Sequence, residues 1–106
     1  MEKNEFNNPI DVFFNNHGKT RYMVGLDSGL SDGQLYEATK KSVKKHNFDF
    51  YEQIGISLEM SGSEVITQLL EIEAELYKQG KLSENYKETM KSKKRERKAV
   101  KRTKQG

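Results

Sequence analysis

Hydrophobic side chains recur along the chain with two different periods. In residues 48–60 the even positions are apolar except for Glu52, and the odd positions are polar or small except for Tyr51. This alternation is typical of a half-buried strand. In residues 64–79 they recur every three or four positions, which predicts a long amphipathic helix that ends at Gly80. The apolar positions of this helix are Val65, Ile66, Leu69, Leu70, Ile72, Leu76 and Tyr77.

The N-terminal part of the chain predicts a β-hairpin. Two β-rich runs, Ile10–Asn15 and Lys19–Leu26, flank the turn Asn16-His17-Gly18. Asn and Gly tolerate the positive φ angles that tight hairpin turns require. The two runs are therefore expected to pair as antiparallel strands.

A helix is predicted over about residues 32–46. Ser31 and Gln34 have the spacing of a capping box at its start, and Ser83 is placed to cap a last helix further along the chain. The cationic side chains of the 32–46 helix lie late in it, an order that the helix dipole favours. They include Lys40, Lys41, Lys44 and Lys45.

These elements together predict an α+β fold. A small antiparallel sheet, the hairpin plus the third strand, would pack against two helices, and a basic C-terminal helix or tail would follow. A chain of 106 residues, 33% of them hydrophobic, has room for one modest core. We expect a flexible lead-in over residues 1–9, a single domain over residues 10–90 and an exposed basic tail over residues 91–106.

Charge is segregated along the chain. Residues 84–106 carry ten Lys or Arg and three Glu, a net charge of +7. Residues 1–83 carry nine Lys or Arg and thirteen Asp or Glu, a net charge of −4. A mildly acidic body with a basic end is typical of an interaction tail, most often for a polyanion.

The basic tail is the candidate binding site. Each cationic side chain can displace a condensed counterion from a phosphate backbone, so affinity would come from many salt-sensitive contacts that read charge rather than sequence. No aromatic residue interrupts the run, so the tail itself is not expected to stack on single-stranded bases. The candidate nucleic-acid-binding residues are Lys91, Lys93, Lys94, Arg95, Arg97, Lys98, Lys101, Arg102 and Lys104.

Residues 54–73, IGISLEMSGSEVITQLLEIE, resemble the helix-turn-helix of winged-helix regulators. The resemblance implies a turn at Met60-Ser61 and a recognition helix with inward residues Val65, Leu69 and Ile72. In that family the outer side of this helix carries base-reading polar and basic side chains, and the turn holds a small residue. Here the turn has Glu59, and the outer side would carry Thr67, Gln68, Glu71 and Glu75.

Residues 54–90 also resemble a ribbon-helix-helix unit, with a strand, a helix, a break at Gly80 and a second helix from Ser83. In that family paired strands of two subunits enter the major groove. The outward strand residues here include no Arg or Lys; they are Gln53, Gly55, Ser57 and Glu59. A strand packed on a helix, without either DNA-binding motif, is the remaining alternative.

Catalytic and metal-binding patterns are hard to find. The chain has no cysteine, and His17 and His46 lack a ligand spacing such as HExxH. Residues 25–33, GLDSGLSDG, match neither GxGxxG nor a P-loop and supply too few alternating carboxylates for a calcium loop. We expect a non-enzymatic protein with no metal or cofactor. Because no signal peptide or apolar run of ~20 residues is evident, we also expect no membrane association and a cytoplasmic location.

Two hypotheses for the function stay open. The first is a small accessory protein that binds DNA or RNA, with its tail on the phosphate backbone. The second is a protein-interaction module, such as a phage- or mobile-element-type inhibitor or assembly factor. Its domain surface would dock on a protein partner and the tail would only assist, for example on an acidic protein surface.

The 64–79 helix also permits a homodimer. Val65, Leu69, Ile72 and Leu76 have the spacing of a coiled-coil seam and could cover the sheet. The row Ile66–Leu70–Tyr77 would then meet a second subunit. In the alternative, both rows are buried in the monomer.

Overall fold

The structure, a computed structural model, describes residues 6–91. Within this range every regular element is helical and none is a strand, so the predicted α+β fold with its antiparallel sheet is wrong. The elements are α1 (Pro9–Asn16), α2 (Arg21–Ser28), α3 (Asp32–Ala38), the 3₁₀ turn η1 (Val43–Lys45), α4 (Phe48–Leu58) and α5 (Gly62–Lys78). Residues 84–91 are also helical and are called the C-terminal helix below.

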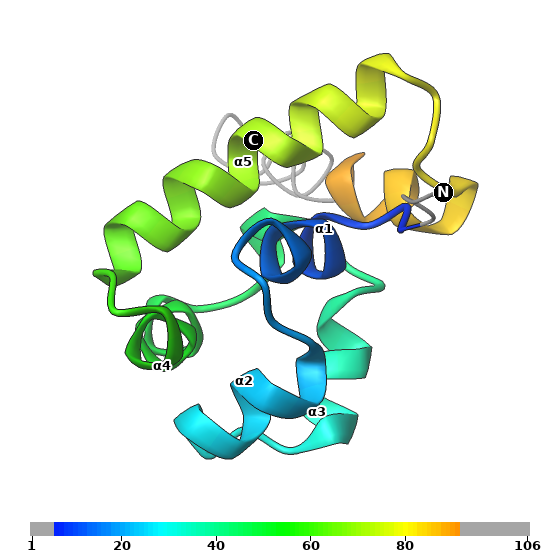
Figure 1. Ribbon diagram of the computed structural model, residues 1–106. Helices are drawn as coiled ribbons and strands as arrows, with labels where there is room; N and C mark the ends of the chain where they lie inside the picture. The colour runs from blue at the N-terminus through cyan, green and yellow to red at the C-terminus, as the bar shows by residue number, and fades with distance from the viewer. Residues whose placement is uncertain (1–5, 92–106) are drawn as a thin grey trace, which may run out of the picture.

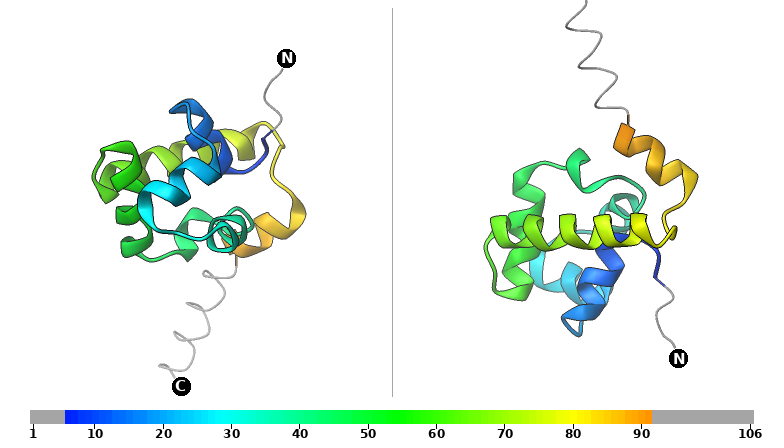
Figure 2. Two further views of the ribbon diagram at one scale, coloured as in Figure 1. Left: turned by 60° about the horizontal axis from the view of Figure 1, so that its bottom comes forward. Right: turned by 90° about the horizontal axis from the view of Figure 1, so that it is seen from above.

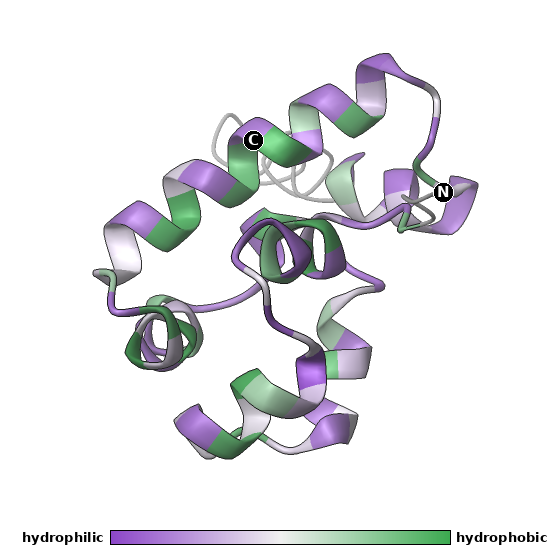
Figure 3. Ribbon diagram, in the orientation of Figure 1, coloured by the Kyte–Doolittle hydropathy of each residue, from purple (hydrophilic) through white to green (hydrophobic). Residues whose placement is uncertain are grey.

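The longest helix, α5, runs along one side of the molecule (Figure 1). It packs against α4, α1 and η1, while α2 packs against α4, α3 and α1. Hydrophobic and hydrophilic stretches alternate along α5, as its helical period requires (Figure 3). The C-terminal helix turns back from the end of α5 toward the segment that joins α3 to α4 (Figure 2).

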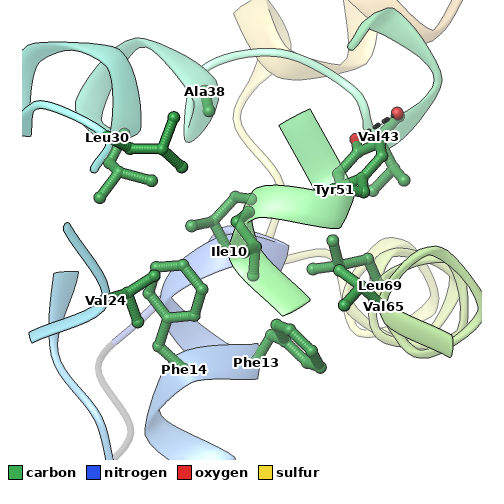
Figure 4. Close-up of a cluster of buried hydrophobic side chains, with 12 residues drawn as sticks. Ile10, Phe13, Phe14, Val24, Leu30, Ala38, Val43, Tyr51, Val65 and Leu69 are labelled. Atoms are coloured by element: carbon green, nitrogen blue, oxygen red, sulfur yellow. Dashed lines mark hydrogen bonds between the residues drawn. The ribbon is translucent and has the colours of Figure 1, made fainter. Parts of the chain in front are cut away.

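One main core holds the helices together (Figure 4). Side chains from α1, α2, α3, α4 and α5 meet in it, together with Val43 from the connection between α3 and α4. A smaller cluster beside it, Leu76, Leu82 and Tyr86, attaches the C-terminal helix to α5. Buried residues of the main core include Ile10, Phe13, Phe14, Val24, Leu35, Tyr51, Ile54, Val65 and Leu69.

The expected hairpin is two helices, α1 and α2. Asn8 caps α1 by accepting the backbone N–H of Asp11 at 2.8 Å, and Pro9 stands at a first-turn position, where its missing N–H costs nothing. Gly18, with φ of 72°, ends α1 rather than turning a hairpin, since Lys19 N–H reaches back to the Phe14 carbonyl at 2.9 Å. These helix-end signals outweigh the β propensity of the residues between them.

The expected third strand is helix α4. Its buried residues Tyr51, Ile54 and Gly55 are spaced as one helical face. Phe48 and Ile56, which fit the alternating pattern, are 47% and 64% exposed instead of buried. The alternation therefore arose from two apolar residues on the solvent side of a helix.

The helix predicted over residues 32–46 begins as expected but is shorter. Ser31 and Gln34 form the expected capping box, with the backbone N–H of Gln34 donating to Ser31 Oγ at 3.1 Å. The helix ends at Ala38. Ser42 and Val43 then lie against α5, where both donate hydrogen bonds to the buried carboxylate of Glu73. A tertiary contact thus interrupts the local helical preference.

Helix α5, predicted over residues 64–79, is present and spans Gly62–Lys78. Ser61 and Glu64 form a capping box at its start. At its end Gly80 has φ of 70°, Lys81 N–H donates to the Leu76 carbonyl at 3.0 Å and Gly80 N–H donates to the Tyr77 carbonyl at 3.1 Å. This pair of bonds is a Schellman motif, which satisfies carbonyls that the helix end would otherwise leave unpaired.

Candidate nucleic-acid interface

The structure describes one residue of the predicted site. Lys91 is exposed at the end of the C-terminal helix, with its Nζ 3.9 Å from a carboxylate oxygen of Glu88. The other members of the predicted site lie outside the described residues: Lys93, Lys94, Arg95, Arg97, Lys98, Lys101, Arg102 and Lys104. What the structure adds is the surface from which the basic segment departs.

The C-terminal helix is fixed against the connection between α3 and α4. The backbone N–H of Ser42 donates to Thr89 Oγ1 at 2.8 Å. Thr89 lies two residues before Lys91, and Lys41 directly precedes Ser42. The start of the basic tail and a second basic segment therefore meet at this hydrogen bond.

A buried carboxylate on α5 anchors both segments. Glu73 is 4% exposed and accepts hydrogen bonds from the Ser42 hydroxyl at 2.9 Å, the Val43 N–H at 3.0 Å and the Tyr86 hydroxyl at 2.6 Å. Burial, followed by the hydrogen bond to Glu73, raises the pKa of Tyr86 well above its ordinary value. Tyr86 therefore stays a neutral donor at physiological pH, and its bond to Glu73 holds the C-terminal helix in place.

Four lysines that are not among the predicted site residues flank Ser42 and Val43 in the chain: Lys40, Lys41, Lys44 and Lys45. All four are exposed, on the connection between α3 and α4 rather than on a continuous helix. Within residues 6–91, no carboxylate forms an ion pair with Lys40, Lys41 or Lys44. We call the set Lys40, Lys41, Lys44, Lys45 and Lys91 the lysine junction. The sequence signal for four of these five lysines is the run KKSVKK, residues 40–45. The same lysines also fit the dipole of the predicted 32–46 helix, so the run did not stand out as part of a binding site.

An aromatic hollow of about 610 Å³ lies among α1, α2 and α3, next to the junction. Phe6, Tyr22 and Tyr36 line it, and all three rings are exposed. The Nζ of Lys40 lies 4.4 Å from the centroid of the Tyr36 ring, and the guanidinium of Arg21 lies 5.6 Å from it. These cation–π contacts connect the aromatic hollow to the lysine junction.

The local geometry of a helix-turn-helix is present. Helices α4 and α5 are joined by residues 59–61, and α4 is seen nearly end-on in Figure 1 while α5 runs across the view. Glu59 takes the left-handed conformation, with φ of 57°, at the place where the resemblance expects a small residue. The predicted inward residues Val65 and Leu69 are fully buried, and Ile72 is partly buried.

The chemistry of this unit differs from that of a DNA reader. The outer face of α5 exposes Glu64, Glu71 and Glu75. A shallow groove at the α4–α5 turn is lined by Glu52, Glu59 and Glu64 together with the apolar side chains Phe48, Ile56 and Met60. Phosphates would be repelled from this surface, so we do not assign base reading to α5.

The ribbon-helix-helix resemblance fails, because the segment that would supply its strand is helix α4. The idea of a strand packed on a helix fails for the same reason. In the predicted dimer row of α5, Leu70 and Tyr77 are exposed and Ile66 is partly buried, so the two rows of α5 are not both buried in the monomer. Dimerisation through this row stays a prediction.

His46, beside the junction, gives a prediction for pH dependence. Burial, followed by the charge of Lys41, lowers the pKa of His46 below its ordinary value of 6.5. As pH falls below about 6.5 the unfolded chain takes up a proton before the folded protein does, so the free energy of unfolding decreases. In urea titrations at pH 7 and pH 5, His46→Gln is expected to lose less stability on acidification than the wild type.

The matched comparison for this prediction is His17→Gln, which changes the exposed second histidine. The assignment to His46 is wrong if its variant keeps the full decrease in stability between the two pH values, or if both variants reduce it equally.

Residues 6–91 contain no group of three or more His, Cys, Asp or Glu side chains that could hold a metal ion. None of the helices in this range has the length and apolar character needed to cross a bilayer.

The candidate interface therefore consists of the lysine junction, which includes Lys91 at the start of the basic tail, and the aromatic hollow beside it. Comparison with known proteins adds no assignment: the chain matches no protein-family model, no curated protein and no solved structure.

Proposed function

We propose that the protein is a non-enzymatic accessory protein that binds nucleic acid on its phosphate backbone. The cationic side chains of the basic tail and those of the lysine junction would both contact phosphates. The hydrogen bond between Ser42 and Thr89 is the observation that carries the proposal, because it joins the two basic segments. The cationic side chains of these segments, among them Lys41, Lys44 and Lys91, are exposed to solvent.

Electrostatics supports the use of this side of the molecule. The lysine junction lies by the C-terminal half of α5, where Glu73 holds its two segments, whereas the acidic groove lies at the N-terminus of α5. Such a charge distribution would orient the protein on a polyanion with the junction toward the phosphates. Affinity would fall steeply as salt is added.

The test is a fluorescence-anisotropy titration of labelled DNA and RNA at several salt concentrations. With about six phosphates engaged, log K is expected to fall with log[salt] at a slope of about −5. The double variant Lys41→Gln/Lys44→Gln should make this slope shallower by about 2, since each lost contact removes about 0.9. Its affinity at low salt should fall in parallel.

The matched control is Lys78→Gln/Lys81→Gln, which removes two exposed lysines that precede the C-terminal helix, at the end away from Thr89. This control should keep the wild-type slope. The proposal is overturned if the wild type fails to bind at low salt, and the role of the junction is overturned if the two double variants behave alike.

A second candidate function is a protein-interaction module, favoured by the groove at the α4–α5 turn. Phe48 and Ile56 are exposed there between three glutamates, a combination suited to a basic amphipathic segment of a partner protein. Under this alternative the wild type would bind no DNA or RNA at low salt. Nucleic-acid titration therefore separates the two candidates.

A further inference from the structure

The aromatic hollow carries the further inference. Three aromatic rings, from the segment before α1, from α2 and from α3, face one concave surface although they lie far apart in the sequence. Tyr22 is the most exposed of them, at 66%. An exposed aromatic ring offers a flat face to which a planar ligand can stack at little cost in side-chain entropy.

The charges around the hollow are arranged unevenly. Arg21 is paired through Nε with Asp11 Oδ1 at 2.9 Å, so this cation is largely neutralised. Lys19 also lines the hollow, but its Nζ is paired with Asp27 Oδ2 at 3.0 Å. Asp32 lines the hollow as well and would repel phosphate from it. Lys40 lies over the Tyr36 ring, on the side that continues into the lysine junction. An anionic ligand would therefore place its phosphates on the Lys40 side and its planar groups in the hollow.

We infer that the hollow binds the bases of single-stranded nucleic acid while the lysine junction holds the adjoining phosphates. This inference rests on the proposed function and adds a ligand class to it. Every base has a π-face, so stacking on Tyr22 would tolerate any sequence. Cation–π contacts hold Lys40 and Arg21 against the Tyr36 ring, which lines the same hollow as Tyr22.

A duplex cannot use the hollow in this way. Its base faces are covered by neighbouring bases, so a surface tyrosine reaches them only if the stack is opened, which costs free energy. The lysine junction and the tail contact phosphates in either form. The ratio of single-strand to duplex affinity therefore measures base stacking in the hollow. The salt dependence of the affinity measures the phosphate contacts of the cationic side chains.

The test measures binding of the full chain to an oligothymidine strand and to a duplex of equal length, at one low salt concentration. Tyr22→Ala is expected to lower single-strand affinity about tenfold and to leave duplex affinity within about twofold of the wild type. Tyr22→Phe keeps the stacking face and should retain the single-strand affinity. A 2-aminopurine base in the strand should be quenched on binding the wild type and Tyr22→Phe, but less by Tyr22→Ala.

The matched control is Tyr77→Ala, which removes a ring of similar exposure, 57%, from α5. It should bind both oligonucleotides like the wild type. If the wild type binds both but Tyr22→Ala weakens neither, or weakens both equally, the hollow has no stacking role and the proposed function survives. If the wild type binds neither oligonucleotide, the proposed function and this inference fall together, and the aromatic hollow is left to a protein partner.

Discussion

Gly55→Ala is expected to lower the free energy of unfolding by about 3 kcal/mol or more, a large part of the stability of a small domain. A Cβ atom at this position would lie 2.2 Å from the carbonyl oxygen of Met60. That oxygen belongs to the backbone between α4 and α5, so the clash is relieved only if the two helices move apart. The packing of Tyr51 and Ile54 of α4 with Val65 of α5 in the main core would loosen as a result. Urea unfolding followed by far-UV circular dichroism measures the change.

Gly33→Ala is the matched control for this prediction. A Cβ atom there meets only the Ser31 hydroxyl oxygen, at 3.9 Å, and the residue lies inside helix α3. Alanine should stabilise it by about 0.5–1 kcal/mol, because glycine has the greater backbone freedom to lose on folding. Equal urea midpoints for the two variants would show that α4 and α5 do not approach as closely as described.

Removal of residues 92–106 is expected to lower affinity for DNA or RNA at least about 100-fold at low salt. Eight cationic side chains are lost, and each contributes a share of counterion release. The remaining salt slope should be shallow, set by the lysine junction alone. The urea midpoint should not change, because Tyr86 and Thr89, which anchor the C-terminal helix, precede the cut. Anisotropy titrations and urea unfolding of the shortened chain measure the two effects.

A chain in which the order of residues 92–106 is permuted is the control for sequence reading. It keeps composition and charge, so it should bind as the wild type does if the tail contacts phosphates alone. Loss of binding by the permuted chain, or full binding by the shortened chain, would contradict the assigned role of the tail.

Helices with strong end signals were predictable from the sequence. The α5 stripe, its end at Gly80 and the Ser31–Gln34 box depend on neighbours within one or two turns, and all three are present. The α1 helix was missed because Ile, Val and Phe favour strands, although Asn8-Pro9 is a good helix start. The start of α1 could therefore have been predicted from Asn8 and Pro9 alone.

Other features could not be read locally. The alternation in residues 48–60 gave no sign that Phe48 and Ile56 would lie on the solvent side of α4. The end of α3 depends on Glu73, about 35 residues further on, and the lysine junction depends on a bond between Ser42 and Thr89. Contacts over such separations are set by packing of the whole domain, so the sequence indicated a basic tail but not the surface from which it leaves.

The carboxylate of Glu73 also makes it costly in free energy to displace the C-terminal helix even slightly. Pulling this helix away would remove the Tyr86 hydroxyl and leave a charged oxygen short of donors in a water-poor environment. A force that a ligand exerts on the basic tail would therefore act on α5 through Tyr86 and Glu73, and on η1 through the bond between Glu73 and Val43. The residues that immediately precede the basic tail are thus fixed to the buried part of α5.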